Sequence, residues 1–127
     1  MTERRIRLRG LRGATCLKQD DAQEMFEAVG ELVKVMMEQN DVADDDVVSL
    51  ILTSTPDLTC AFPAAGARAY GLVDVPLLCA QEINVAGGLE KVVRILMHIE
   101  STKSRADVRH VYLRGAEVLR QDLKHNT

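Results

Sequence analysis

The longest stretch of regularly spaced apolar residues predicts an amphipathic helix in the first third of the chain. Asp20 or Asp21 can cap its amino end, because a short carboxylate accepts hydrogen bonds from the free amides of the first turn. The apolar positions follow the i, i+1, i+4, i+7, i+8 spacing of one helix face. They are Met25, Phe26, Val29, Leu32, Val33, Met36 and Met37. We expect this face to pack against the core.

Apolar and β-branched segments elsewhere in the chain predict strands. These segments are residues 6–15, 47–53, 75–80 and 108–113, with 117–119 as a further short candidate. Gly10 and Gly13 are expected to interrupt the first of them. The acidic run 44–46, just before the second, is expected to form a solvated turn rather than a metal site.

Proline and glycine mark the ends of two further predicted helices. Pro63 near the start and Gly71 at the end delimit a helix over residues 62–71, whose small side chains would let it approach another backbone. Gly87 and Gly88 are expected to open the second helix. One side of that helix would carry Leu89, Val92, Val93, Leu96 and Glu100.

In chain order these elements predict one α/β (α+β) domain spanning residues 1–127. Its core would be a mixed β-sheet with helices packed on one face. With 46% hydrophobic and 28% charged residues, the composition is that of an ordinary globular protein. The polar end of the chain, from about residue 120 to residue 127, is expected to be mobile.

The arginines of the first predicted strand raise a question of parity, because side chains alternate between the two faces of a strand. Arg5, Arg7 and Arg9 share one face, whereas Arg12 falls on the opposite, apolar face. A buried charge without partners is costly, so Arg12 would need anionic partners or an open pocket. A bulge at Gly10 would instead reset the parity and leave Arg12 in solvent. The pattern alone leaves both alternatives open.

Two further charged residues are less distinctive in the sequence. Glu82 follows the apolar run 75–80, and strand ends often carry functional residues, although an ordinary exposed carboxylate would give the same pattern. On the predicted helix that begins at Gly88, Arg94 lies about 140° around the axis from Leu89, at about 100° per residue. This position is outside the apolar arc and indicates a plain surface arginine.

Composition and charge narrow the possible functions. A net charge of −3 and four scattered aromatic residues argue against a nucleic-acid partner. Eleven arginines against five lysines provide planar forks for carboxylates, although biased codon usage would produce the same excess. Three cysteines without metal-type spacing, no apolar signal segment and no membrane-length run predict a cytoplasmic protein without membrane association. No nucleophile–base pair, phosphate loop or metal cluster is recognisable, so the residues alone nominate Arg12 and Glu82.

Several short segments, taken together, resemble one enzyme family. They are residues 9–15 (RGLRGAT), 54–58 (STPDL), 61–64 (AFPA), 75–76 (VP), 79–82 (CAQE), 87–89 (GGL), Arg94, 109–113 (RHVYL) and 118–120 (VLR). In this order and at nearly this spacing they resemble the monofunctional bacterial chorismate mutases whose subunits form a trimeric pseudo-α/β-barrel. The resemblance implies that fold, a homotrimer with active sites between subunits, chorismate as the substrate, and neither cofactor nor metal.

The resemblance also implies the reaction and the residues that perform it. The reaction is the rearrangement of chorismate to prephenate in phenylalanine and tyrosine biosynthesis, by conformational restraint and electrostatic stabilisation without a covalent intermediate. The catalytic residues would be Arg94 at the ether oxygen, Glu82 at the ring hydroxyl and Arg12 at a carboxylate. The substrate-binding positions would be Arg12, Phe62, Ala64, Arg68, Leu77, Leu78, Cys79, Glu82, Arg94, Tyr112, Leu119 and Arg120. Of these, Leu119 and Arg120 match a mobile C-terminal cover.

The chain departs from the family pattern in three places. Ala65 stands where a lysine is frequent, Leu78 where a more polar residue is usual, and the loop 68–75 looks one residue short. Two other functions remain compatible with the residues. One is an enzyme similar to the trimeric imine deaminases, which have a similar barrel, and the other is a non-catalytic trimer that binds a small dicarboxylate.

Overall fold

The computed structural model describes residues 5–119, which form one five-stranded sheet and two helices packed against it. The strands are β1 (Arg7–Cys16), β2 (Val47–Ser54), β3 (Leu77–Gln81), β4 (Val92–Ser101) and β5 (Val111–Tyr112). The helices are α1 (Ala22–Gln39) and α2 (Pro63–Tyr70), and a 3-10 turn, η1, spans Asp44–Asp46. The order across the sheet is β3-β2-β4-β1-β5.

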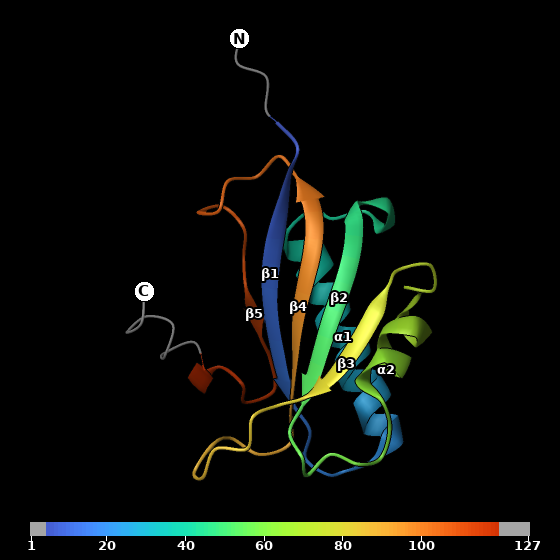
Figure 1. Cartoon of the computed structure of the whole chain (residues 1–127), viewed down its shortest axis with the longest axis vertical. Helices are drawn as coiled ribbons and strands as arrows, with labels where there is room; N and C mark the ends of the chain where they lie inside the picture. The colour runs from blue at the N-terminus through green and yellow to red at the C-terminus, as the bar shows by residue number, and fades with distance from the viewer. Residues whose placement is uncertain (1–4, 120–127) are drawn as a thin grey trace.

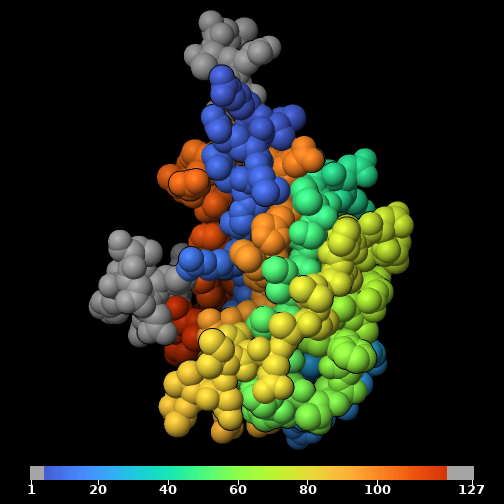
Figure 2. Space-filling model, viewed as in Figure 1, coloured from blue at the N-terminus to red at the C-terminus, as the bar shows by residue number. Residues whose placement is uncertain are grey.

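The sheet is mixed, because β4 runs against both of its neighbours. β1 and β2 pair antiparallel with β4, whereas β3 runs parallel to β2 and β5 parallel to β1. Both helices lie on the far side of the sheet in Figure 1, and neither covers the near face. In Figure 2 the side chains of β1, β4, β2 and β3 form the surface of that near face, which we call the open face. The predicted mixed sheet with helices on one side is confirmed.

The core lies between α1 and the covered face of the sheet. Of the two predicted candidates, Asp20 and Asp21, it is Asp21 that caps α1, since its side chain accepts a hydrogen bond from the Glu24 amide at 2.9 Å. The predicted apolar stripe of α1 is buried except for Phe26, which is half-buried. Opposite it lie helix-facing strand residues that are at most 2% exposed. They are Leu11, Leu50, Leu52, Ile95, Met97 and Ile99.

Two glycines allow the helices to pack closely. A Cβ added to Gly66 of α2 would lie 2.8 Å from the Val29 Cβ of α1, which confirms that small residues bring this helix against another backbone. A Cβ added to Gly13 would collide with the Met36 sulfur. The predicted interruption of the first strand at Gly10 and Gly13 is wrong, because β1 pairs with β4 without a break. Gly13 makes room for α1 and does not end a strand.

The helix predicted after Gly88 is the largest error of the sequence analysis, because this segment forms β4 at the centre of the sheet. Its burial alternates with a period of two: Val93, Ile95 and Met97 are buried, whereas Arg94 is exposed. The run of apolar and β-branched residues in the sequence is compatible with the period of a helix and with that of a strand. Pairing with two neighbouring strands decides in favour of the strand.

Two smaller predictions also differ from the structure. The strand expected over 108–113 is confined to Val111–Tyr112, and residues 117–119 form a turn with helical conformation rather than a strand. The short helix over 62–71 is confirmed as α2, which ends at Gly71 with the positive φ of 133° that favours glycine. Among residues 5–119, no helix is long and apolar enough to cross a bilayer.

Candidate active site

The candidate site lies on the open face, at the edge where β1, β2, β3 and β5 end and β4 begins. A cavity of about 420 Å³ is present there, within the range typical of small-molecule sites. The site residues that line it come from six separate segments. They are Arg12, Thr53, Glu82, Arg94, Tyr112 and Leu119.

Arg12 reaches this cavity because the parity of β1 is never reset. The β1–β4 register runs unbroken from Arg7 to Cys16, so the bulge considered at Gly10 is wrong. Arg12 therefore shares its face with Leu8, and this apolar face is the open one. The charge needs no burial, because Arg12 is exposed and lines the cavity.

Glu82 and Arg94 form the charged centre of the cavity. Arg94 Nε lies 3.4 Å from Glu82 Oε2, and the hydroxyl of Thr53 donates a hydrogen bond of 2.6 Å to the same carboxylate oxygen. The amide of Glu82 donates to the Ser54 carbonyl at 2.9 Å, which extends the β2–β3 pairing by one residue. Glu82 is thus oriented by two neighbours on β2 and in turn orients the Arg94 guanidinium.

Thr53 is the member of this group that the sequence analysis missed. It is the Cα partner of Arg94 across the β2–β4 pair, so both side chains project from the same face. The available signal was a hydroxyl at the end of an otherwise apolar strand. Because Arg94 was assigned to a helix, this hydroxyl could not be placed beside it from the sequence.

Tyr112 enters the cavity from β5, where it is the partner of Ala14 on β1. Two side chains fix the segment that carries it. Buried Asn40 donates to the Arg109 carbonyl at 2.9 Å and accepts from the Arg109 amide at 2.7 Å. The Arg12 amide donates to His110 Nδ1 at 2.9 Å, which ties this segment directly to β1.

The cavity has an excess of positive charge. Its charged lining residues are two guanidinium groups, from Arg12 and Arg94, and one carboxylate, from Glu82. This arrangement suits an anion, since guanidinium donors bind carboxylates in a planar, bidentate manner. Within residues 5–119, no group of three or more histidine, cysteine or acidic side chains is placed to hold a metal ion.

The other residues expected from the resemblance lie away from this cavity. Phe62, 75% exposed, and Cys79 line a second cavity of about 690 Å³ beside the start of α2. Ala64 is buried in the core and Arg68 is exposed on α2. Arg120 lies outside the described residues. The last two expected residues, Leu77 and Leu78, differ in orientation. Leu77 packs towards the core, whereas Leu78 is 63% exposed on the open face.

The loop beside the second cavity is held by Asp20. This carboxylate accepts hydrogen bonds from the amides of Thr59 and Cys60, both at 2.9 Å, and from the Thr59 hydroxyl at 2.8 Å. Hydrogen bonds from the side chains of Cys60 and Thr59 lower the pKa of Asp20 to about 2. Desolvation and then the hydrogen bond to Asp20 raise the pKa of the Cys60 thiol to about 11. The segment leading to Phe62 is therefore anchored to the loop before α1.

Known proteins resemble this chain in both sequence and fold. The family model for chorismate mutase type I matches residues 8–123. Chorismate mutase AroH of Bacillus subtilis (strain 168) is 39% identical over 117 residues, which cover 91% of this chain and 92% of that protein. Chorismate mutase AroH of Thermus thermophilus is 42% identical over 118 residues, covering 92% and 97%.

A solved structure extends the likeness to three dimensions. Chorismate mutase from Clostridium thermocellum, Cth-682, superposes with a TM-score of 0.85 at 43% identity, over 87% of this chain and 98% of that chain. The family match over residues 8–123 includes the residues that line the cavity. The chain therefore belongs to the chorismate mutase type I family.

Proposed function

We propose that this protein catalyses the rearrangement of chorismate to prephenate in the cavity at the end of β1, β2 and β3. The observation that carries the proposal is the grouping of Arg12 and Arg94 with a single carboxylate, Glu82, in one cavity. Chorismate carries two carboxylates, which match an excess of fixed positive charge. The membership of the chain in the family supports the same activity.

The reaction explains why such a site needs neither a nucleophile nor a base. One C–O bond breaks and one C–C bond forms within a single molecule, and no proton is transferred. A protein accelerates such a step by holding the two reacting ends in contact and by stabilising charge that develops as the C–O bond breaks. Both tasks require fixed side chains rather than titrating ones.

Arg94 is the residue we assign to the breaking bond. A guanidinium is a permanent cation, so this side chain can stabilise the ether oxygen by charge without exchanging a proton. Glu82 orients it at 3.4 Å, and Thr53 fixes Glu82 at 2.6 Å. We assign Glu82 in addition to the ring hydroxyl, which a carboxylate oxygen can accept.

Arg12 and Tyr112 are assigned to the substrate carboxylates. They project from adjacent strands on the open face and line the same cavity as Arg94. Leu119 also lines this cavity and supplies an apolar contact. This division places the anionic ends of the substrate on Arg12 and Tyr112 and the reacting oxygen on Arg94.

We also propose that the active enzyme is a homotrimer, with each site completed by a neighbouring copy. The second set of expected residues lies outside the Arg94 cavity in the same chain, which favours delivery from another chain. They are Phe62, Ala64, Arg68, Leu77, Leu78 and Cys79. The open face also exposes apolar side chains, Leu8 at 61% and Leu78 at 63%, that association would bury. We place the enzyme in the cytoplasm on the grounds of its sequence.

The proposed activity is tested by following the loss of chorismate absorbance with the purified protein. Turnover to prephenate supports the proposal. Binding of a prephenate-like anion without turnover would instead identify a dicarboxylate-binding protein, and turnover of an unstable imine alone would identify a deaminase.

The shared site is tested by mass in solution and by complementation between two damaged subunits. Arg94→Ala and Arg68→Ala chains, each impaired at low chorismate, are unfolded and refolded together. If Arg94 and Arg68 come from different copies, mixed trimers contain sites with both arginines intact and recover activity. A monomer with full activity, or mixtures no better than the average of the two variants, would refute the shared site.

A further inference from the structure

The two charged residues at the centre of the site, Glu82 and Arg94, lie on either side of one loop. Glu82 lies directly before residues 83–91, and Arg94 follows two residues into β4. Most of this loop is exposed, including Ile83 at 82% and Val85 at 65%. The distance between Glu82 and Arg94 therefore depends on what holds the two ends of this loop in place, in addition to the pairing of Arg94 with Thr53 and Ala14.

Both ends are held by the segment Ser54–Asp57, which contains a motif that the proposed chemistry does not use. At the first end, the Glu82 amide donates to the Ser54 carbonyl at 2.9 Å. At the second end, the Thr55 amide donates to the Val92 carbonyl at 3.0 Å, and the Val92 amide donates to the Thr55 hydroxyl at 3.0 Å.

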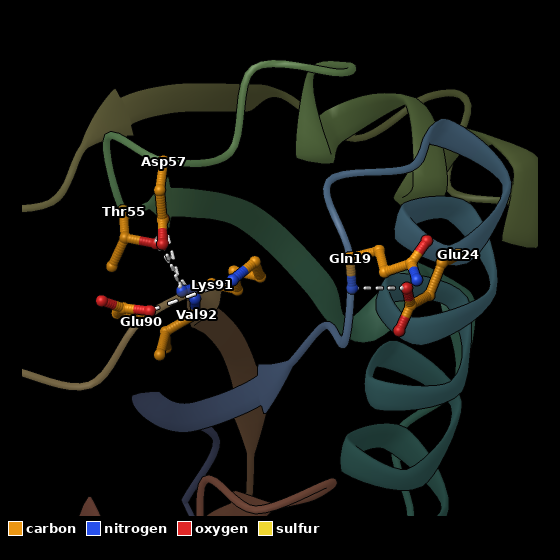
Figure 3. Close-up of polar contacts among 7 residues, drawn as sticks. All are labelled: Gln19, Glu24, Thr55, Asp57, Glu90, Lys91 and Val92. Atoms are coloured by element: carbon orange, nitrogen blue, oxygen red, sulfur yellow. Dashed lines mark hydrogen bonds and ion pairs between the residues drawn. The ribbon is translucent and has the colours of Figure 1, made fainter.

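Asp57 completes the second attachment, as Figure 3 shows. The Lys91 amide donates to both of its carboxylate oxygens, at 3.0 and 3.3 Å, and the Thr55 hydroxyl donates to Oδ1 at 2.5 Å. The Val92 amide, the Thr55 hydroxyl and the Asp57 carboxylate thus form one chain of hydrogen bonds that ends on a charge.

The backbone of Lys91 explains why a hydrogen-bond acceptor is needed here. Its φ is 53°, in the left-handed region that a residue with a Cβ rarely adopts. The Lys91 carbonyl meanwhile accepts from the Leu17 amide at 2.8 Å, so the peptide planes on both sides are fixed. Without Asp57 the left-handed turn would lose the interaction that compensates for its strain.

We infer that Asp57 is a positioning residue that sets the Arg94 guanidinium against Glu82 by fixing the turn at Lys91 where β4 begins. The inference rests on the proposed function, because Arg94 matters to turnover only if it meets the breaking bond. Asp57 itself touches no substrate in this assignment. Thr55 is its partner, and together they connect the end of β2 to the start of β4.

The test compares turnover of chorismate by Asp57→Ala, Asp57→Asn and the control Asp45→Ala at a temperature where all three are folded. Asp45 is an exposed carboxylate on η1, far from this loop in sequence. We expect Asp57→Ala to lower kcat about 10- to 100-fold with a smaller change in KM, since displacement of a catalytic group by about 1 Å costs up to about 100-fold. Asp57→Asn keeps an oxygen acceptor for Lys91 and should recover most of the loss, and Asp45→Ala should match the wild type.

A double-mutant cycle separates positioning from general damage. In an Arg94→Ala background, Asp57→Ala should lower kcat by less than about twofold, because the group it positions is already absent. Equal fold-losses in both backgrounds, or an unchanged kcat in Asp57→Ala, would overturn the inference. A loss confined to melting temperature would do the same.

Amide hydrogen exchange over residues 83–92 keeps the inference testable apart from catalysis. Exchange should accelerate in Asp57→Ala and stay unchanged in Asp45→Ala, and equal protection in Asp57→Ala and wild type would overturn the anchoring itself. If the wild-type protein fails to convert chorismate, the proposed function fails. The exchange data still decide whether Asp57 holds the loop.

Discussion

The covered and open faces of the sheet are made by alternate residues of the same strands, yet the candidate site residues lie on the open face. On the covered face, Leu11 and Met97 are fully buried against α1. On the open face, Arg12 directly follows Leu11, and Arg94 lies three residues before Met97. Both arginines are exposed and line a cavity. A step of one residue along a strand therefore separates core packing from the candidate chemistry.

Because the charged site residues lie on the open face, folding does not require their burial. Arg94 is 46% and Glu82 24% exposed in their side chains, so solvent screens the pair, and such pairs add only about 0–1 kcal/mol to stability. Stability should come from the covered face and activity from the open face.

The largest effect is expected on the covered face. Leu11→Ala should lower the free energy of unfolding by about 2–5 kcal/mol, since a fully buried leucine leaves a cavity that its neighbours fill incompletely. The activity per folded molecule should stay near that of the wild type. Urea unfolding and an assay normalised to folded protein measure the two quantities. A stable Leu11→Ala protein with lost activity would show that the faces are not independent.

The opposite result is expected for Arg94→Ala on the open face. Turnover should fall about 100-fold or more, equivalent to about 2.7 kcal/mol of transition-state stabilisation, because one preorganised donor is removed. The melting temperature should change by no more than a few degrees, since the guanidinium is half exposed. Steady-state kinetics and a thermal melt test this. Normal turnover by the purified variant would refute the mechanism.

The same contrast explains what the sequence could predict. The stripe of α1, the Asp21 cap and the Pro63-to-Gly71 helix depend on local periodicity and end signals, so they are confirmed. Strand β4 depends on two neighbours distant in the chain, β1 and β2, and its continuous apolar run was interpreted as a helix. Local patterns carry little information about such pairing.

The candidate site was predictable to the same extent. Strand parity left two alternatives for Arg12, the face of Leu8 or solvent after a bulge at Gly10, and the unbroken register of β1 decides for the first. Parity could not reveal that neither α1 nor α2 covers this face, because coverage is set by where these two helices pack. The ion pair of Glu82 with Arg94, and the hydroxyl of Thr53, required the strand order β3-β2-β4. The likeness to a family supplied Arg94 where periodicity could not, whereas Thr53 was found only from the structure.

A smaller effect is expected for Asn40, which connects the end of α1 to the segment before β5. Asn40 is 1% exposed and donates to the carbonyl of Arg109 while accepting from its amide. Asn40→Ala should cost about 1–3 kcal/mol of stability by leaving buried polar groups without partners. It should also raise KM, since Tyr112 follows on the same segment. Denaturant unfolding and kinetics test both, and a loss of stability with unchanged KM would separate Tyr112 from this anchor.

The smallest effect is expected from Asp20, which belongs to neither face and is exposed. Its pKa in the folded chain is about 2, below the ordinary value of 3.8, because the side chains of Cys60 and Thr59 donate to the ionised form. Between pH 4 and pH 2 the unfolded chain therefore binds more protons at this residue, so its contribution to stability is present above pH 4 and is lost as the pH falls. The difference in melting temperature between wild type and Asp20→Asn should shrink over that window, whereas the difference for Asp45→Asn should stay small throughout. A gap between wild type and Asp20→Asn that is constant with pH would show that the acid sensitivity of the fold arises elsewhere.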